Sequence, residues 1–145
     1  MRIEKTFKFY AAHRNQSLEG KCSNLHGHRY GVTVVLEPER TRAGITMLFE
    51  DIDQAIEPII ARYDHGCLID ENDPALSSLS RIENNSGEPM KLIRMDGETS
   101  AENLAARLFE EIKVTGLPLV EIRLQETDSS VVIYDVMDDF LKETE

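Results

Sequence analysis

Residues 2–38, RIEKTFKFYAAHRNQSLEGKCSNLHGHRYGVTVVLEP, decide the fold because they contain two strand-like segments joined by a loop. In residues 2–13, Phe7 and Phe9 stand among polar residues at roughly period two, which is typical of a half-buried strand. Residues 28–38 are rich in β-branched side chains and end at a proline, which predicts a second strand. The loop between them is too long for a tight hairpin, so we expect antiparallel pairing across a longer connection.

Two later segments carry apolar residues at helical spacing, residues 49–62 and residues 99–113. Pro58 removes a backbone hydrogen bond inside the first of these, which predicts a kink. Thr99 and Glu102 fit a capping box at the start of the second.

Residues 119–127 and 130–136 alternate as strands joined by a short turn. The order ββ-α-α-ββ predicts an α+β fold, a four-stranded antiparallel sheet with two helices packed on one face. The length predicts a single domain over residues 1–145, with an irregular insertion at about residues 71–97.

The chain has a net charge of -11, from 16 basic and 27 acidic residues, which argues against non-specific binding to nucleic acid or to anionic membranes. No apolar run approaches the roughly 20 residues that cross a bilayer, and the charged start of the sequence is not a secretion signal. We therefore expect a cytoplasmic protein whose two cysteines are thiols.

Three of the four histidines fall at the ends of the first two predicted strands. His26 and His28 are two residues apart and therefore share one face of a strand. Antiparallel pairing brings His13, at the end of the preceding strand, beside them. Three imidazoles on one surface match a catalytic zinc site with an open position. Histidine pairs on strands also occur without metal, and imidazoles suit copper, iron or nickel as well.

The two cysteines and the remaining histidine also carry groups that could react. The sequence leaves three roles open for Cys22, namely a fourth ligand, a reactive thiol or a simple loop residue. A nearby dication would lower the pKa of its thiol. Cys67 lies among apolar residues and is interpreted as inert core. His65 suits a general acid or base, although an Asp64–His65 dipeptide is more often a helix end, and adjacent side chains point apart unless the backbone turns irregularly there.

Glu126 lies in an apolar strand, in LQET. Most glutamates at strand ends are solvated. A buried carboxylate would instead suit an amide-like heterocycle that offers two N–H donors.

Five motifs, AAHR, CSNLHGHRY, YDH, TSAEN and LQET, occur in this order along nearly the whole chain. Together they resemble the 6-pyruvoyl-tetrahydropterin synthase / 6-carboxytetrahydropterin synthase family. The three residues between the cysteine and His-Gly-His resemble the bacterial 6-carboxytetrahydropterin synthases of queuosine biosynthesis.

The resemblance implies a role for each matching residue. His13, His26 and His28 match the zinc ligands. Cys22 matches the catalytic cysteine, the dipeptide Asp64–His65 the acid/base pair, and Glu126 the glutamate that anchors the pterin.

The resemblance also implies the tunnelling fold and a homo-hexamer built as a dimer of trimers, with active sites at subunit interfaces. The implied substrate is 7,8-dihydroneopterin triphosphate, and the implied activity is that of a zinc-dependent lyase. The basic residues nearest the cluster, Arg14, Lys21 and Arg29, are candidates for contacting the triphosphate.

Two features depart from the family pattern. Leu48 stands where the family often has Asp or Asn before the first helix, although Glu50 and Asp51 can still favour the helix N-terminus. Residues 71–97 are longer than the corresponding link in short bacterial enzymes, which predicts a reshaped pocket mouth.

Overall fold

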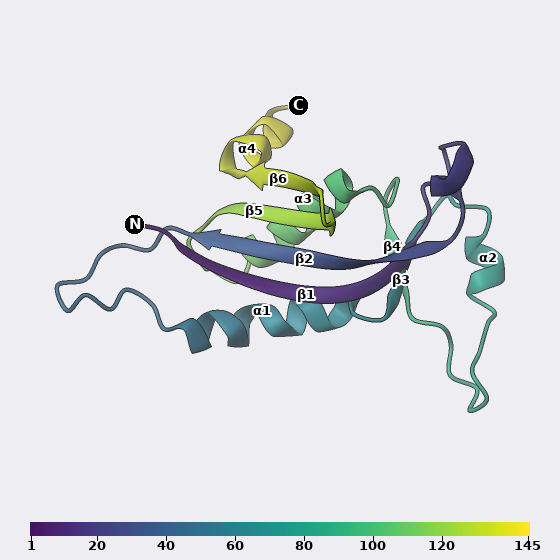
Figure 1. The fold of residues 1–145 in the computed structure, drawn as a ribbon, viewed down its shortest axis with the longest axis horizontal. Helices are drawn as coiled ribbons and strands as arrows, with labels where there is room; N and C mark the ends of the chain where they lie inside the picture. The colour runs from purple at the N-terminus through teal and green to yellow at the C-terminus, as the bar shows by residue number, and fades with distance from the viewer.

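A computed structural model describes residues 1–145 as one six-stranded mixed sheet with four helices. The strand order is β4-β3-β1-β2-β5-β6 (Figure 1). The predicted α+β class is confirmed. The predicted four-stranded antiparallel sheet and the ββ-α-α-ββ order are wrong, because two short parallel strands join the sheet and two further helices are present.

The centre of the sheet is the predicted antiparallel pair, β1 (Ile3–His13) and β2 (His26–Leu36). β5 (Leu119–Thr127) pairs with β2, and a two-residue turn leads into β6 (Ser130–Asp135). Along β1 and β2 the apolar side chains alternate onto one face, which the helices cover.

Two strands lie outside the predicted four-stranded sheet, β3 (Gly66–Asp70) and β4 (Leu92–Met95), and β4 falls in the segment PMKLIRM, whose sequence suggests a short strand. β3 pairs parallel with β1 at Ala11 and Ala12, and β4 pairs parallel with β3. All five residues of β3 are buried, so the strand has no polar–apolar alternation for sequence inspection to detect.

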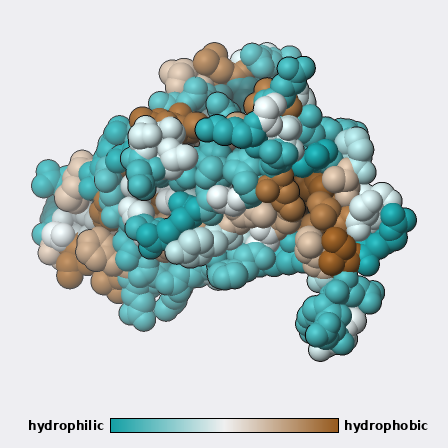
Figure 2. All heavy atoms as spheres, turned by 45° about the vertical axis from the view of Figure 1, so that its right-hand side comes forward, coloured by the Kyte–Doolittle hydropathy of each residue, from teal (hydrophilic) through white to brown (hydrophobic).

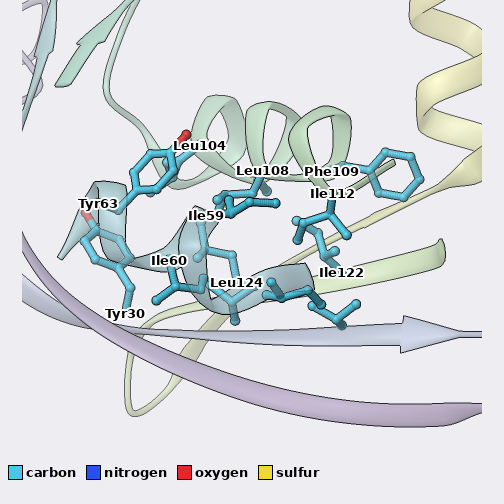
Figure 3. Close-up of a cluster of buried hydrophobic side chains, with 14 of the residues drawn as sticks. Tyr30, Ile59, Ile60, Tyr63, Leu104, Leu108, Phe109, Ile112, Ile122 and Leu124 are labelled. Atoms are coloured by element: carbon cyan, nitrogen blue, oxygen red, sulfur yellow. The ribbon is translucent and has the colours of Figure 1, made fainter. Parts of the chain in front are cut away.

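Two amphipathic helices, α1 (Phe49–Tyr63) and α3 (Ala101–Lys113), lie on the same side of the sheet and enclose the core. Figure 3 shows their apolar side chains meeting those of the central strands, including Tyr30 and Leu124. α1 continues through Pro58, and no side chain caps its start at Leu48. Glu50 and Asp51 occupy its first turn, which favours that N-terminus electrostatically.

The predicted capping box at Thr99 and Glu102 is wrong. Ser100 is the N-cap of α3, and its side chain accepts a hydrogen bond from the backbone N–H of Asn103. Thr99 is fully buried and turns toward β1 instead. The cap therefore sits one residue later and leaves Thr99 free to support the end of β1.

The fourth helix, α4 (Val136–Thr144), was not expected from the sequence. It begins at residue 136, the last residue of the strand predicted over residues 130–136. A reciprocal capping box between Asp135 and Asp138 starts it, and Asp139 pairs with Lys113 at the end of α3. The strand therefore ends at Asp135, and the following residues form a helix.

Residues 71–97 contain one helical turn, α2 (Leu76–Leu79), and an isolated bridge between Glu83 and Pro89 before β4 begins. The segment between α2 and β4 projects from the body of the molecule (Figure 1), and Figure 2 shows a hydrophilic protrusion there. At its base the buried Asp73 accepts two 2.7 Å hydrogen bonds from Arg14.

None of the helices has the length and apolar character needed to span a membrane.

Replacing Asp73 with Asn is expected to lower the free energy of unfolding by about 1.5–3 kcal/mol near neutral pH, because a charge-assisted pair is lost. Arg14 holds the pKa of the Asp73 carboxyl below its ordinary value. This stabilisation is therefore full above the unfolded-state pKa of about 4 and is lost as the pH falls through the lower folded-state pKa.

Urea denaturation at several pH values would check this, with Glu37→Gln as the control. Glu37 makes only an exposed pair with Arg2, so its loss should change stability by less than about 1 kcal/mol. A gap between Asp73→Asn and the unsubstituted protein that stays constant down to about pH 2 would contradict the assignment.

Gly66, the first residue of β3, is expected to tolerate no larger side chain. A Cβ at this position would lie 2.3 Å from the end of the Ile93 side chain and 3.1 Å from the carbonyl oxygen of Tyr63. We expect Gly66→Ala to destabilise the protein by about 1–3 kcal/mol through overpacking. At Gly31 a Cβ meets only Gln125, at 3.5 Å, so Gly31→Ala should be neutral or slightly stabilising. Equal thermal unfolding of the two variants would disprove this contrast.

Candidate functional site

The three strand-end histidines lie together, as the strand pairing predicted. His13 is the register partner of His26, and Ala11 is the partner of His28. All three side chains alternate onto the helix-covered face, and their ligand nitrogens lie within 4.8 Å of one another. His13 is fully buried, while the other two are half-buried.

Backbone carbonyls orient two of the rings. Nδ1 of His13 lies 2.7 Å from the carbonyl oxygen of Thr99, and Nδ1 of His26 lies 2.7 Å from that of Asn24. A carbonyl only accepts, so each Nδ1–H donates and each neutral ring presents the Nε2 lone pair to the cluster. The Thr99 hydroxyl donates to the carbonyl of Arg14 and so fixes the position of the Thr99 backbone.

The donor set fits a metal ion. Nε2 of His13 and of His28 is buried and has no hydrogen-bond partner, a rare state for a polar atom unless it serves a ligand. Burial lowers the pKa of the His28 imidazole, which favours the neutral form that binds metals. Three imidazoles on one surface, two of them oriented by outer hydrogen bonds, resemble the arrangement that zinc sites use.

Glu126, at the end of β5, joins this cluster. Its Oε1 lies 3.0 Å from Nε2 of His28 and 3.3 Å from Nε2 of His13. Contact with His13 keeps the pKa of the Glu126 carboxyl below its usual value, so the group is ionised at neutral pH. The carboxylate is therefore charged and adjacent to the three rings.

Asp64 and His65 form a hydrogen-bonded pair although they are adjacent in sequence. His65 adopts a left-handed backbone conformation with φ of 59°, the only non-glycine residue to do so, and its Nδ1 lies 2.8 Å from Oδ2 of Asp64. The irregular backbone that this pairing requires is therefore at His65 itself. Such strain in a non-glycine residue is commonly found at functional sites.

β1 holds this pair in place through its backbone. The N–H of Tyr10 donates to Oδ1 of Asp64, and the N–H of His65 donates to the carbonyl of Tyr10, at 2.9 and 2.7 Å. The bond from Tyr10 is the main reason that the pKa of Asp64 is lowered. An ionised Asp64 therefore orients an imidazole that is 79% exposed at its side chain.

The Asp64–His65 pair and the histidine cluster occupy opposite faces of the sheet. His65 borders an open hollow of about 470 Å³ whose other lining residues include Tyr10, Ala12 and Arg29. Strand alternation directs these three side chains away from the helices, whereas His13 points toward them. A single chain therefore does not bring His65 onto the face of the three histidines.

Cys22 lies in the short 3-10 segment Gly20–Ser23 and is half-buried. The backbone of this loop is tied down by a hydrogen bond from Asn15 to the Cys22 carbonyl. Cys67 lies inside β3, and burial raises the pKa of its thiol, which is typical of an unreactive core cysteine.

Sequence inspection missed the contribution of Thr99 to this site. TSAEN drew attention as a helix start, and the helical pattern hid the fact that Thr99 packs against His13. Tyr10 was missed too, because it acts on Asp64 through its backbone N–H, which no side-chain pattern reports.

Comparison with known proteins agrees with this architecture. The "6-carboxy-5,6,7,8-tetrahydropterin synthase" of Aquifex aeolicus is 29% identical over 91% of this chain and 96% of its own length. That of Haemophilus influenzae is 28% identical over 92% and 97%. An uncharacterized protein from Wolinella succinogenes has the same fold, with a TM-score of 0.77 and 22% identity over 94% of this chain and 98% of that one.

The 6-pyruvoyl tetrahydropterin synthase of Caenorhabditis elegans shares the fold at a TM-score of 0.66, with 21% identity over 93% of this chain and 94% of that one. The sequence model of the family described as "6-pyruvoyl tetrahydropterin synthase" matches residues 2–136. This chain therefore belongs to the 6-pyruvoyl tetrahydropterin synthase family.

Proposed function

We propose that the protein is a zinc-dependent lyase that converts 7,8-dihydroneopterin triphosphate to 6-carboxy-5,6,7,8-tetrahydropterin, with release of acetaldehyde and triphosphate. The observation that carries the proposal is the convergence of three imidazoles, two of them with buried, unpartnered Nε2 atoms, beside an ionised glutamate. The names of the relatives support the carboxy-forming reaction, and a place in queuosine precursor synthesis is part of the proposal.

His13, His26 and His28 would hold one zinc ion per subunit. Bound there, zinc supplies a Lewis acid that polarises oxygen atoms of the substrate. The protein's own task is to keep the three rings neutral and aligned, which the carbonyls of Thr99 and Asn24 do for two of them.

The remaining site residues would handle the substrate and its protons. Cys22, as thiolate, is assigned the removal of a proton from the substrate side chain. His65, oriented by Asp64 through its Nδ1, would pass protons at its exposed Nε2. Glu126 would accept N–H donors of the pterin ring through its carboxylate oxygens.

The location of the Asp64–His65 pair on the opposite face supports an oligomeric site. A neighbouring subunit would supply His65 to the histidine cluster of this chain, in a cytoplasmic homo-hexamer built as a dimer of trimers. This arrangement explains why a strained, exposed dyad is maintained at a distance from the metal ligands of its own chain.

The triphosphate would be met by Lys21 or Arg29, whose side chains are exposed near the two ends of the Cys22–His28 segment. Arg14, the third candidate, is already held by Asp73 through both of its bonded nitrogens. Arg14 therefore stabilises the fold and is less available to bind the triphosphate.

The second candidate within the family is the pyruvoyl-forming reaction, in which triphosphate is eliminated and the side chain is kept. The same residues would serve it. A non-catalytic metal- or pterin-binding protein is the alternative of a different class, and it would bind zinc and pterin without turnover.

The first test is turnover. Zinc-loaded protein with 7,8-dihydroneopterin triphosphate should yield the 6-carboxy product and acetaldehyde, identified by mass spectrometry. Cys22→Ala should lower kcat by about 10²–10⁴-fold through loss of the proton-transferring group. Cys67→Ala is the matched control and should keep its activity. A 6-pyruvoyl product would assign the pyruvoyl-forming reaction to the protein instead. The absence of any product would support a non-catalytic metal- or pterin-binding protein.

The second test measures metal content. His26→Ala should lose most of the zinc from an expected one ion per chain, because two imidazoles hold zinc far more weakly than three. His65→Ala should retain the metal and lose turnover. Metal content by mass spectrometry separates the two variants, and full zinc retention in His26→Ala would remove this ligand from the set.

A further inference from the structure

The contact of Glu126 with His13 is not explained by a hydrogen bond from a neutral ring, whereas His28, whose Nδ1 has no partner, can donate its Nε2–H to the carboxylate. Oε1 lies 3.0 and 3.3 Å from Nε2 of His28 and of His13, yet neither nitrogen has a hydrogen-bond partner. His13 uses its Nδ1–H for the Thr99 carbonyl, so a neutral His13 directs a lone pair at the carboxylate. Two acceptors at this distance repel each other unless a positive charge lies between them.

The spacing of Glu126 from His13 and His28 is compatible with a shared metal ion. Bonds from zinc to nitrogen and oxygen are about 2.0–2.2 Å long, so two ligands of a tetrahedral ion are about 3.3–3.5 Å apart. The distances from Glu126 to His28 and His13 are at or slightly below that edge length, whereas the group of ligand atoms that all lie within 4.8 Å of one another contains the three histidines alone. We propose that Glu126 is the fourth ligand of the metal ion in the substrate-free protein, an inference that rests on the zinc centre of the proposed function.

The position of Glu126 in the sheet allows its carboxylate to leave the ion again. The pairing of β5 with β6 shifts register between Gln125 and Thr127, so Glu126 lies in an irregular part of the strand. Such irregularities commonly re-aim a side chain next to a site. The Glu126 side chain is 24% exposed and borders two hollows of about 350 and 420 Å³.

Glu126 would therefore exchange partners. In the resting protein its carboxylate closes the fourth position of the ion and partly neutralises its charge. When a pterin arrives, the bond between metal and carboxylate breaks, an oxygen of the substrate side chain takes the vacated position, and the carboxylate accepts the N–H groups of the ring. Only a ligand that offers both an oxygen and ring N–H donors would open the centre in this way.

The test compares Glu126→Gln with Glu121→Gln. Both residues belong to β5 and are exposed to a similar degree, but Glu121 pairs with Arg123 on the other face of the sheet. Zinc affinity, measured by chelator competition at one pH, should fall at least tenfold in Glu126→Gln and stay unchanged in Glu121→Gln. The visible spectrum of the cobalt-substituted protein, which reports the ligand set, should change only in Glu126→Gln.

A further readout uses 7,8-dihydroneopterin, which lacks the triphosphate leaving group. Adding it should shift the cobalt spectrum of the unsubstituted protein, as the carboxylate leaves the metal. Glu126→Asp provides a second variant if Glu126→Gln fails to fold. Its zinc affinity should lie between those of the unsubstituted protein and Glu126→Gln, because its side chain is one methylene shorter.

The outcomes are distinguishable. If the unsubstituted protein binds no zinc, the proposed function fails together with this inference. If the unsubstituted protein and Glu126→Gln have the same zinc affinity, and their cobalt-substituted forms have the same spectrum, the zinc centre stands and Glu126 is not a ligand. That second result would mean that a shared proton, rather than the metal, holds the carboxylate against the rings.

Discussion

The antiparallel register of β1 and β2 is the constraint on which the site depends. It places His13 opposite His26, and the pleat then directs both rings and that of His28 to one face. A shift of one residue would turn one strand's histidines to the other face, away from those of its partner. The same register buries Phe9 and Tyr30 side by side in the core, with ring centroids 5.0 Å apart, so core packing and site geometry specify one pairing.

Around this pair, the fold supports the site with groups from distant parts of the chain. Thr99, which precedes α3, lies against His13 and ties the start of that helix to the end of β1. Asp73 anchors the base of the 71–97 segment to Arg14, the residue after the first histidine. The irregular segment is thus attached to the site by a buried ion pair, although its tip projects away from the molecule (Figure 1).

The sheet also separates two kinds of chemistry. Its helix-covered face holds the rings that can bind a metal ion, in an environment where His13 is fully buried. The opposite face holds an exposed imidazole oriented by an ionised carboxylate. In the proposed assembly, a neighbouring subunit would bring its exposed imidazole to the face that holds the three histidines.

The sequence by itself determined the central strand pair, the two amphipathic helices, the last hairpin and the grouping of three histidines. These are local patterns of period and spacing, or follow from one antiparallel pairing. Only the tertiary structure decided that β3 and β4 join the sheet in parallel, and β3, which is buried on both faces, has no alternation that a sequence pattern could report. The tertiary structure also decided the roles of Thr99 and Tyr10, which act through backbone atoms, and the contact of Glu126 with rings nearly 100 residues earlier. Such contacts depend on how distant segments pack, and no local pattern in the chain encodes them.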